Sequence, residues 1–328
     1  MPGMRALRFH KTGEPDVLVL EEVPAPTPRA GEVLLRVRAI GINWADTRFR
    51  RGEYFVRPQL PQIAGMEAAG EVIALGEGVR ELAVGDRVMA LGENAYAEQM
   101  TARADHCYPM PAGLSFVEAA ALPVQGLTAH HTLGLHGRLV AGESVLVHAA
   151  AGGVGSLAVQ LARRLGASKV IGTAGSDDKR ALVQELGADL AVDYRAADWM
   201  HRVREATGGV GVDVILEMIG GTESYKRNLA CLAPLGRLVV YGAATGDTRG
   251  QVEPIGLMHK NHTVSGYYLT PMLRRRDLCA PALASIAADV VEKRLRVLIG
   301  AEAPLAEGSR LHREMEARGT TGKLVLVP

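Results

Sequence analysis

The chain has 328 residues, which suggests about two domains at roughly 150 residues each. Lysine and arginine total 37 and aspartate and glutamate total 36, so the formal net charge of +1 argues against a nucleic-acid or anionic-membrane partner. Hydrophobic residues make up 48% and charged residues 22%, and this composition excludes a disordered chain.

No segment reads as a membrane span or a targeting signal. The most apolar stretch, 144–162, is interrupted by His148 and Gln160 and lacks the roughly 20 consecutive apolar residues that a spanning helix needs. Residues 1–10 show no apolar segment followed by a cleavage site, so we expect a cytoplasmic protein. The cysteines are too few and too widely separated for a disulfide framework or a zinc site: Cys107, Cys231 and Cys279.

The first 125 or so residues are rich in short strands. Val33–Ile40 and Gly70–Leu75 have strand-like patterns, and turn residues follow at 76–78 and 85–86. Short strands with frequent turns predict a small barrel or a curled antiparallel sheet.

From about residue 126 the pattern changes to alternating strands and helices. The predicted strands are Ser144–His148, Lys169–Thr173, Leu190–Val192, Val212–Glu217 and Arg237–Tyr241. The predicted helices are Ser156–Leu165, Asp178–Leu186, Ala197–Ala206 and Glu223–Cys231. This alternation predicts a doubly wound parallel sheet of the Rossmann type over residues 126–268.

The last sixty residues contain a predicted helix, Pro281–Arg294, then polar connections and a closing strand, Lys323–Val327. A strand this late, with no helix after it, is expected to return to the first sheet. We therefore expect an α/β protein in which residues 1–125 plus 269–328 form one discontinuous domain and 126–268 form an inserted one.

A glycine cluster, His148–Ser156, lies between the predicted strand 145–147 and the helix that follows. This context predicts a dinucleotide-binding loop. Gly152 lets the backbone approach a pyrophosphate, and Gly155 lets the helix pack closely on the strand. Ala150 stands where the usual motif has its first glycine.

The end of the second strand bears on the choice of cofactor. An NAD site places an acidic residue there for the ribose hydroxyls, whereas this chain has Ser176 and Lys179, which suit a 2′-phosphate. This favours NADPH over NADH. The alternative is that Ser176 or Asp177 caps a helix and Lys179 is solvated, and Asp178 adds further negative charge.

Five motifs carry a family resemblance: Gly41–Asp46, Gly65–Val72, Gly126–Ala129, His148–Gly155 and Thr320–Lys323. With them the chain resembles, essentially end to end, the medium-chain dehydrogenase/reductase superfamily, and within it the zinc-free NADPH:quinone oxidoreductases (the ζ-crystallin-like branch). The resemblance implies a GroES-like catalytic domain around a Rossmann domain. Zinc-dependent branches carry Cys and His where this chain has Asn43 and Met66, and the four-cysteine lobe is missing after Gly85. This disfavours a metal and leaves hydride transfer from NADPH to an electrophilic acceptor.

The resemblance also implies site residues. The pyrophosphate would meet Gly152, Gly153 and Val154 beside Gly155. The 2′-phosphate and adenosine ribose would meet Ser176, Lys179, Tyr194 and Arg318. The nicotinamide end would meet Tyr241, Gly242 and Ala243. The catalytic candidates are Asn43 and Thr128 beside the nicotinamide and its ribose, and Tyr54 as a proton donor.

Each of these roles has a structural alternative. Tyr54 would be a half-buried packing residue. Asn43 would hydrogen-bond the backbone of its own loop, which Asp46 would also support. Tyr194 and Arg318 would lie on the surface. Arg48 stands where related bacterial quinone reductases often have tyrosine, so the shape of the acceptor pocket is open.

Three functions follow from these residues. The first is NADPH-dependent reduction of quinones. The second is an ene-reductase acting on alkenals, enones or enoyl thioesters. A basic patch near the pocket would favour a coenzyme A thioester as its substrate, and the residues that could form one are Arg48, Arg50, Arg51 and Arg57. The third is a non-catalytic NADPH-binding protein, crystallin-like or RNA-binding. The family suggests a homodimer, formed by edge strands around 263–265, and the expected partner is a small electrophile, not a nucleic acid or a membrane.

Overall fold

The computed structural model describes residues 3–328, and these divide into two compact units. Unit 1 contains the described residues up to Gly126 together with Met272–Pro328, and unit 2 is Leu127–Pro271. Within the described part of the chain, no helix has the length and apolar character needed to cross a lipid bilayer.

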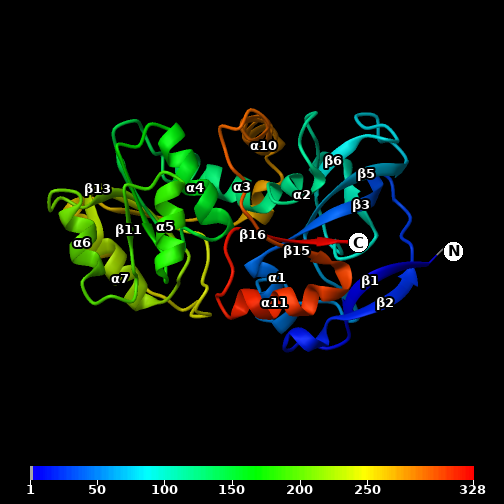
Figure 1. Ribbon diagram of the computed structural model, residues 1–328, viewed down its shortest axis with the longest axis horizontal. Helices are drawn as coiled ribbons and strands as arrows, with labels where there is room; N and C mark the ends of the chain where they lie inside the picture. The colour runs from blue at the N-terminus through cyan, green and yellow to red at the C-terminus, as the bar shows by residue number, and fades with distance from the viewer. Residues whose placement is uncertain (1–2) are drawn as a thin grey trace. The chain divides into compact units, whose positions relative to one another are not determined.

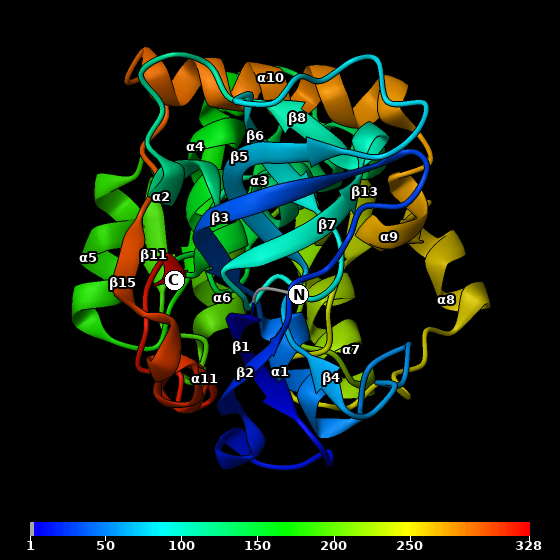
Figure 2. The same ribbon diagram turned by 90° about the vertical axis from the view of Figure 1, so that its right-hand side faces the viewer.

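Unit 1 is built on a seven-stranded sheet (Figures 1 and 2). Its strands are β3 (Glu32–Ile42), β5 (Glu67–Leu75), β6 (Arg87–Leu91), β7 (Gln99–Arg103), β8 (Cys107–Pro109), β15 (Ile299–Pro304) and β16 (Lys323–Val327). The order is β15-β16-β3-β5-β6-β8, with β7 also paired to β3. In β3, buried Leu35 and Val37 alternate with exposed Arg36 and Arg38, because one face of the sheet covers the core.

The remaining elements of unit 1 surround this sheet. A smaller sheet contains β1 (Gly3–Phe9), β2 (Val19–Pro24) and β4 (Gln62–Ile63). The helices are α1 (Trp44–Arg51), α2 (Phe116–Ala119), α10 (Arg276–Val291) and α11 (Gly308–Glu316). Two further helices contain the divisions between the units: α3 (Pro123–His131) and α9 (Leu269–Met272). Figure 2 shows α10 alongside β8, which it contacts.

The closing strand β16 pairs antiparallel with β3, with Leu324 opposite Ile42 and Leu326 opposite Ile40. The predicted return of the chain to its first sheet is therefore confirmed. Burying each of these apolar side chains contributes roughly 1.5–3 kcal/mol.

Unit 2 is a six-stranded, fully parallel sheet. Its strands are β9 (Ser144–Val147), β10 (Lys169–Thr173), β11 (Leu190–Val192), β12 (Val212–Glu217), β13 (Leu232–Val240) and β14 (Thr263–Gly266). The order is β11-β10-β9-β12-β13-β14, so the winding direction reverses between β9 and β12. Nucleotides bind at this kind of reversal, beyond the carboxyl ends of the strands.

Helices cover both faces of this sheet: α4 (Gly153–Arg164), α5 (Asp177–Glu185), α6 (Trp199–Glu205) and α7 (Thr222–Cys231). The short α8 (Pro254–Leu257) has no buried residue. Helices α4 and α5 lie on one side and α6 and α7 on the other (Figure 1). All four residues of β9 are buried, as expected for a strand covered on both faces. The predicted doubly wound sheet is confirmed.

The predicted starts of two elements in unit 2 are wrong for identifiable reasons. Helix α4 begins at Gly153 and not at Ser156, because the Gly152 carbonyl already accepts a hydrogen bond from the Ser156 N–H at 2.8 Å. Strand β13 begins at Leu232 and not at Arg237, and Pro234 falls where the register against β12 shifts. A proline without an N–H is tolerated at such an irregularity.

The tail contains more regular structure than predicted. Helix α10 begins at Arg276, five residues before Pro281, because burial of Cys279, Leu283 and Ile286 on one face offsets the one hydrogen bond that the proline cannot make. The segment expected to hold polar connections forms β15 and α11.

Candidate active site and nucleotide site

The glycine loop of unit 2 has the geometry of a phosphate cradle. A Cβ at Gly155 would lie 2.3 Å from the Ala149 carbonyl oxygen, so only glycine allows this approach of helix to strand. Gly152, Gly153 and Val154 are partly exposed at the start of α4. The first N–H groups of a helix have no partner within it, and they favour an anion together with the helix dipole. The residues present therefore fit a dinucleotide pyrophosphate.

Of the four residues predicted for the adenosine end, Ser176 and Lys179 follow β10, and Tyr194, which follows β11, packs against the same turn. The Ser176 hydroxyl caps α5 by accepting a hydrogen bond from the Lys179 N–H at 3.4 Å. A Cβ at Gly175 would lie 3.2 Å from the Tyr194 hydroxyl oxygen, so Tyr194 packs directly on this turn. Arg318 belongs to unit 1, where it follows α11, and its role at the 2′-phosphate stays a prediction.

The residues predicted for the nicotinamide end lie in a turn that is fixed to the neighbouring loop. The Tyr241 N–H donates to the Glu217 carbonyl at 2.9 Å, and the Ala244 N–H donates to the Met218 carbonyl at 2.8 Å. A Cβ at Gly220 would lie 2.8 Å from the Ala243 Cβ. The loops after β12 and β13 therefore form one bonded unit at the carboxyl edge of the sheet.

In unit 1, Asn43 is held in a buried ionic cluster. Its Nδ2 donates to Glu67 Oε1 at 2.7 Å, and its Oδ1 accepts from Lys323 Nζ at 2.8 Å. Lys323 also forms an ion pair with Glu67, and both side chains are almost fully buried. A Cβ at Gly41 would lie 2.5 Å from Glu67 Oε1, so glycine is required beside the cluster.

This cluster fixes the amide of Asn43 in one orientation. Rotating the amide by 180° would turn its N–H groups toward an ammonium and its oxygen toward a carboxylate. Asn43 is therefore left with one amide N–H beyond the one it donates to Glu67. Sequence reasoning identified Asn43 but gave no role to Glu67 or Lys323, although both lie in the motifs Gly65–Val72 and Thr320–Lys323.

A second group of buried polar side chains supports the same loop. Asp46 Oδ2 accepts a hydrogen bond from the Asn43 N–H at 2.8 Å and another from the Tyr96 hydroxyl at 3.0 Å. Burial raises the pKa of Asp46 to about 7, and burial lowers the pKa of His312, which lies 2.9 Å from the Tyr96 hydroxyl, to about 3. Asp46 thus supports the Asn43 loop.

The other two catalytic candidates lie in different units. Tyr54 is half-buried in unit 1, with its ring centroid 5.4 Å from that of Phe55. Thr128 is buried on α3 in unit 2, and its carbonyl accepts a hydrogen bond from the Thr132 hydroxyl at 2.7 Å. Their catalytic roles stay predictions.

The predicted basic patch is largely neutralised. Arg48 pairs with Glu53 at 2.7 Å, Arg50 is buried against Glu316, and Arg51 pairs with Glu14 and Glu316. Arg57 is exposed. Three of the four arginines therefore already have carboxylate partners, which weakens the case for a coenzyme A thioester, and the acceptor stays a prediction.

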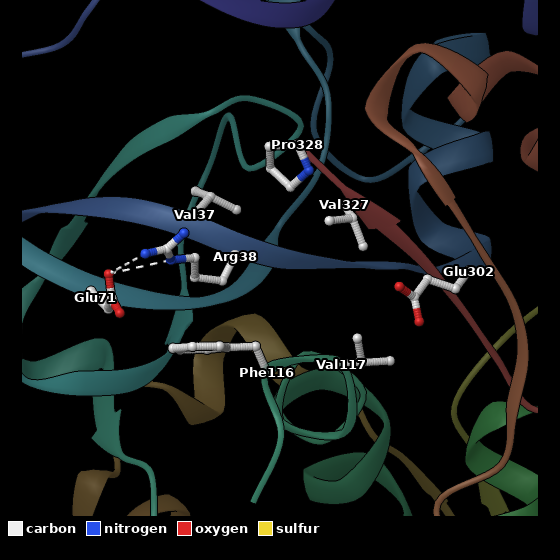
Figure 3. A pocket seen from close by; sticks show the side chains of 8 residues that line it. All are labelled: Val37, Arg38, Glu71, Phe116, Val117, Glu302, Val327 and Pro328. Atoms are coloured by element: carbon white, nitrogen blue, oxygen red, sulfur yellow. Dashed lines mark hydrogen bonds and ion pairs between the residues drawn. The ribbon is translucent and has the colours of Figure 1, made fainter.

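Unit 1 also has a surface hollow of about 430 Å³. Figure 3 shows its lining, with the Arg38–Glu71 ion pair of 2.9 Å on one side and the Phe116 ring below. No residue predicted for the catalytic or cofactor site lines it, so we assign it no part in the chemistry.

Comparisons with known proteins agree with this architecture. Residues 29–133 match the family described as alcohol dehydrogenase GroES-like domain, and residues 153–287 match the family described as zinc-binding dehydrogenase. Quinone oxidoreductase of Rattus norvegicus is 35% identical over 99% of this chain and 98% of that protein. The synaptic vesicle membrane protein VAT-1 homolog of the same species is 35% identical over 100% of this chain and 85% of that protein.

Two solved structures are similar over 99% of this chain and 100% of theirs. The Escherichia coli quinone oxidoreductase complexed with NADPH is 34% identical with a TM-score of 0.93. Mycobacterial Rv1454c complexed with NADPH is 37% identical with the same TM-score. A GroES-like unit combined with a doubly wound nucleotide unit defines an oxidoreductase of the medium-chain dehydrogenase/reductase class, as predicted. The chain belongs to the quinone oxidoreductase branch of this family.

The zinc ion named in one family description does not fit the residues of this chain. Asn43 offers an amide oxygen that already accepts from Lys323, and Met66 offers only a thioether. Among residues 3–328, no group of three or more His, Cys, Asp or Glu side chains is arranged to hold a metal ion. Burial raises the pKa of the Cys107 thiol to about 12, which disfavours the thiolate that zinc requires. We therefore derive no step through a metal.

Proposed function

We propose that this protein reduces quinones with NADPH, by hydride transfer and without a metal. The observation that carries the proposal is the glycine cradle at the start of α4, with Ser176 and Lys179 in place of an acidic residue at the end of β10. The quinone oxidoreductases that resemble the chain along its whole length support the choice of acceptor.

Each unit would have its own role in the reaction. Unit 1 would be the catalytic domain, predicted as 1–125 plus 269–328, and unit 2 the NADPH domain, predicted as 126–268. The pyrophosphate would bind Gly152, Gly153, Val154 and Gly155. The 2′-phosphate and adenosine ribose would bind Ser176, Lys179, Tyr194 and Arg318. The nicotinamide end would bind Tyr241, Gly242, Ala243, Thr128 and Asn43.

When bound, NADPH supplies the hydride. The protein then has to orient the acceptor and stabilise the negative charge that develops on its oxygen. The remaining amide N–H of Asn43, fixed by Glu67 and Lys323, is a preorganised donor for that oxygen. Tyr54 is the proposed source of the proton that must follow.

Parallel assays of NADPH oxidation test the acceptor. The panel contains a 1,2-quinone, a 1,4-quinone, crotonyl-CoA and an enal, with metal analysis of the same preparation. We expect turnover of the quinones and no stoichiometric zinc. Turnover of the alkenes alone would make the protein an ene-reductase, and tight NADPH binding with no turnover would favour a non-catalytic role.

We also propose a homodimer formed through β14, an edge strand of the unit 2 sheet. Light scattering coupled to size-exclusion chromatography tests this, with a mass near 35 kDa as the contradicting result.

A further inference from the structure

Four buried polar side chains cross the carboxyl edge of the unit 2 sheet, and the proposed function gives none of them a role. Thr173 ends β10, His148 follows β9, Glu217 ends β12, and Asn228 lies on α7. Each is no more than 1% exposed. Buried polar groups of this kind are costly unless they are hydrogen-bonded, so their partners indicate what they do.

The four side chains form one continuous series of hydrogen bonds. The Ala149 N–H donates to Thr173 Oγ1 at 3.3 Å, and Thr173 Oγ1 lies 3.2 Å from His148 Nδ1. His148 Nε2 lies 2.7 Å from Asn228 Oδ1, and Asn228 Nδ2 donates to the Glu217 carboxylate.

The chemistry of these groups gives every bond in the series the same direction. Because a carboxylate only accepts, the amide nitrogen of Asn228 faces Glu217 and its oxygen faces His148. His148 therefore carries its proton on Nε2, which leaves Nδ1 to accept from the Thr173 hydroxyl. Hydrogen bonds aligned in this way polarise and strengthen one another.

One end of the series is the glycine loop, which the proposed function assigns to the pyrophosphate, and the other is loop 218–221, which is bonded to the turn assigned to the nicotinamide. At one end, Ala149 opens the glycine loop. At the other, the Glu217 carboxylate accepts from the N–H groups of Ile219 at 2.6 Å and Gly220 at 2.8 Å. That loop is bonded in turn to the turn containing Tyr241 and Ala243, as described above.

We infer that Thr173, His148, Asn228 and Glu217 form a hydrogen-bond chain that couples the glycine loop to loop 218–221, and through it to the proposed nicotinamide turn 241–243. They are positioning residues, since they act through the backbone of loops 149–155 and 218–221. The inference about cofactor geometry rests on the proposed function, but the coupling of the two loops does not.

Hydrogen exchange of the unliganded full-length protein tests the coupling directly. Thr173→Val removes the hydroxyl farthest from loop 218–221 while keeping the shape of the side chain, and Asn228→Leu breaks the link next to that loop. Thr173→Ser restores the hydroxyl. The matched control is Ser144→Ala, which removes a buried hydroxyl bonded to Asp213 at the opposite end of β9.

We expect amide exchange at 218–221 to rise several-fold in Thr173→Val and in Asn228→Leu, and to stay at the wild-type level in Thr173→Ser and Ser144→Ala. The Thr173→Val result is the decisive test of the coupling, because this substitution lies at the end of the hydrogen-bond chain that is farthest from loop 218–221. Unchanged exchange at 218–221 in that variant overturns the coupling.

Fluorescence titration with NADPH then tests the positioning role. Each of the two chain-breaking variants should weaken NADPH binding by about tenfold, the equivalent of one lost hydrogen bond, and Ser144→Ala by less than about twofold. The double variant should lose less than the sum of the single losses, because both break one chain. Additive losses, or losses equal to that of Ser144→Ala, overturn the positioning role. A wild-type protein that does not bind NADPH refutes the proposed function, while the exchange result still decides the coupling.

Discussion

Replacing Lys323 by methionine tests the ionic cluster around Asn43. Lys323 is 1% exposed and Glu67 is fully buried, so the substitution leaves a buried carboxylate without its cation. Removing one partner from such a pair costs about 3–5 kcal/mol of unfolding free energy, whereas replacing both with uncharged groups is often close to neutral. We therefore expect Lys323→Met to lose about 3–5 kcal/mol in urea unfolding, and Lys323→Met/Glu67→Gln to recover most of that loss.

Turnover should not recover with stability. Without the cation and the anion, the Asn43 amide no longer has a fixed orientation, so kcat with a quinone should stay reduced by about tenfold or more in the double variant. The control is Arg310→Met, which breaks exposed pairs with Glu307 and Glu314 and should cost no more than about 1 kcal/mol. A Lys323→Met loss as small as that of the control would show that the pair does not stabilise the fold, and full recovery of kcat in the double variant would show that it does not orient Asn43.

Three further predictions concern single side chains. Lys179→Ala should raise the KM for NADPH by about tenfold or more and leave the KM for NADH nearly unchanged, because one charged hydrogen bond to a phosphate contributes about 1.5–3 kcal/mol. Equal effects on both cofactors in steady-state kinetics would remove Lys179 from the phosphate site. Tyr54→Phe should lower kcat in quinone assays if the hydroxyl delivers the proton, and an unchanged kcat would leave Tyr54 a packing role. The pKa of Asp46 is raised to about 7, so the folded state binds its proton more tightly than the unfolded state does, and this group makes the unfolding free energy fall as pH rises from about 4 to 7. Asp46→Asn removes that contribution, so urea unfolding should show a more positive slope of unfolding free energy against pH over this range than in the wild type. An identical pH profile would contradict the raised pKa.

The nucleotide unit was predictable from sequence because its information is local. Three of its strands begin and end where expected, since short apolar runs such as Val212–Glu217 are bounded by turns and alternate with helical spacing. The errors arise where tertiary packing overrides a local signal. Glycines at 153 and 155 have weak helix propensity yet form the first turn of α4, and Pro281 lies inside α10 because its neighbours are buried.

The candidate site was less predictable because its contacts are distant in sequence. Asn43, Glu67 and Lys323 meet through separate strands of one sheet, and periodicity carries no information about such a meeting. All three residues lie in the family motifs Gly41–Asp46, Gly65–Val72 and Thr320–Lys323, but the motifs do not indicate that the side chains are in contact. The sequence gives His148 no ligand pattern, and its bonds to Thr173 and Asn228 become visible only in the folded sheet.

The most direct test of the account is calorimetric titration of the metal-free protein with NADPH, with NADH as the comparison. We expect one NADPH bound per chain, with an affinity well above that for NADH. Failure to bind NADPH, or binding that requires added zinc, would contradict it.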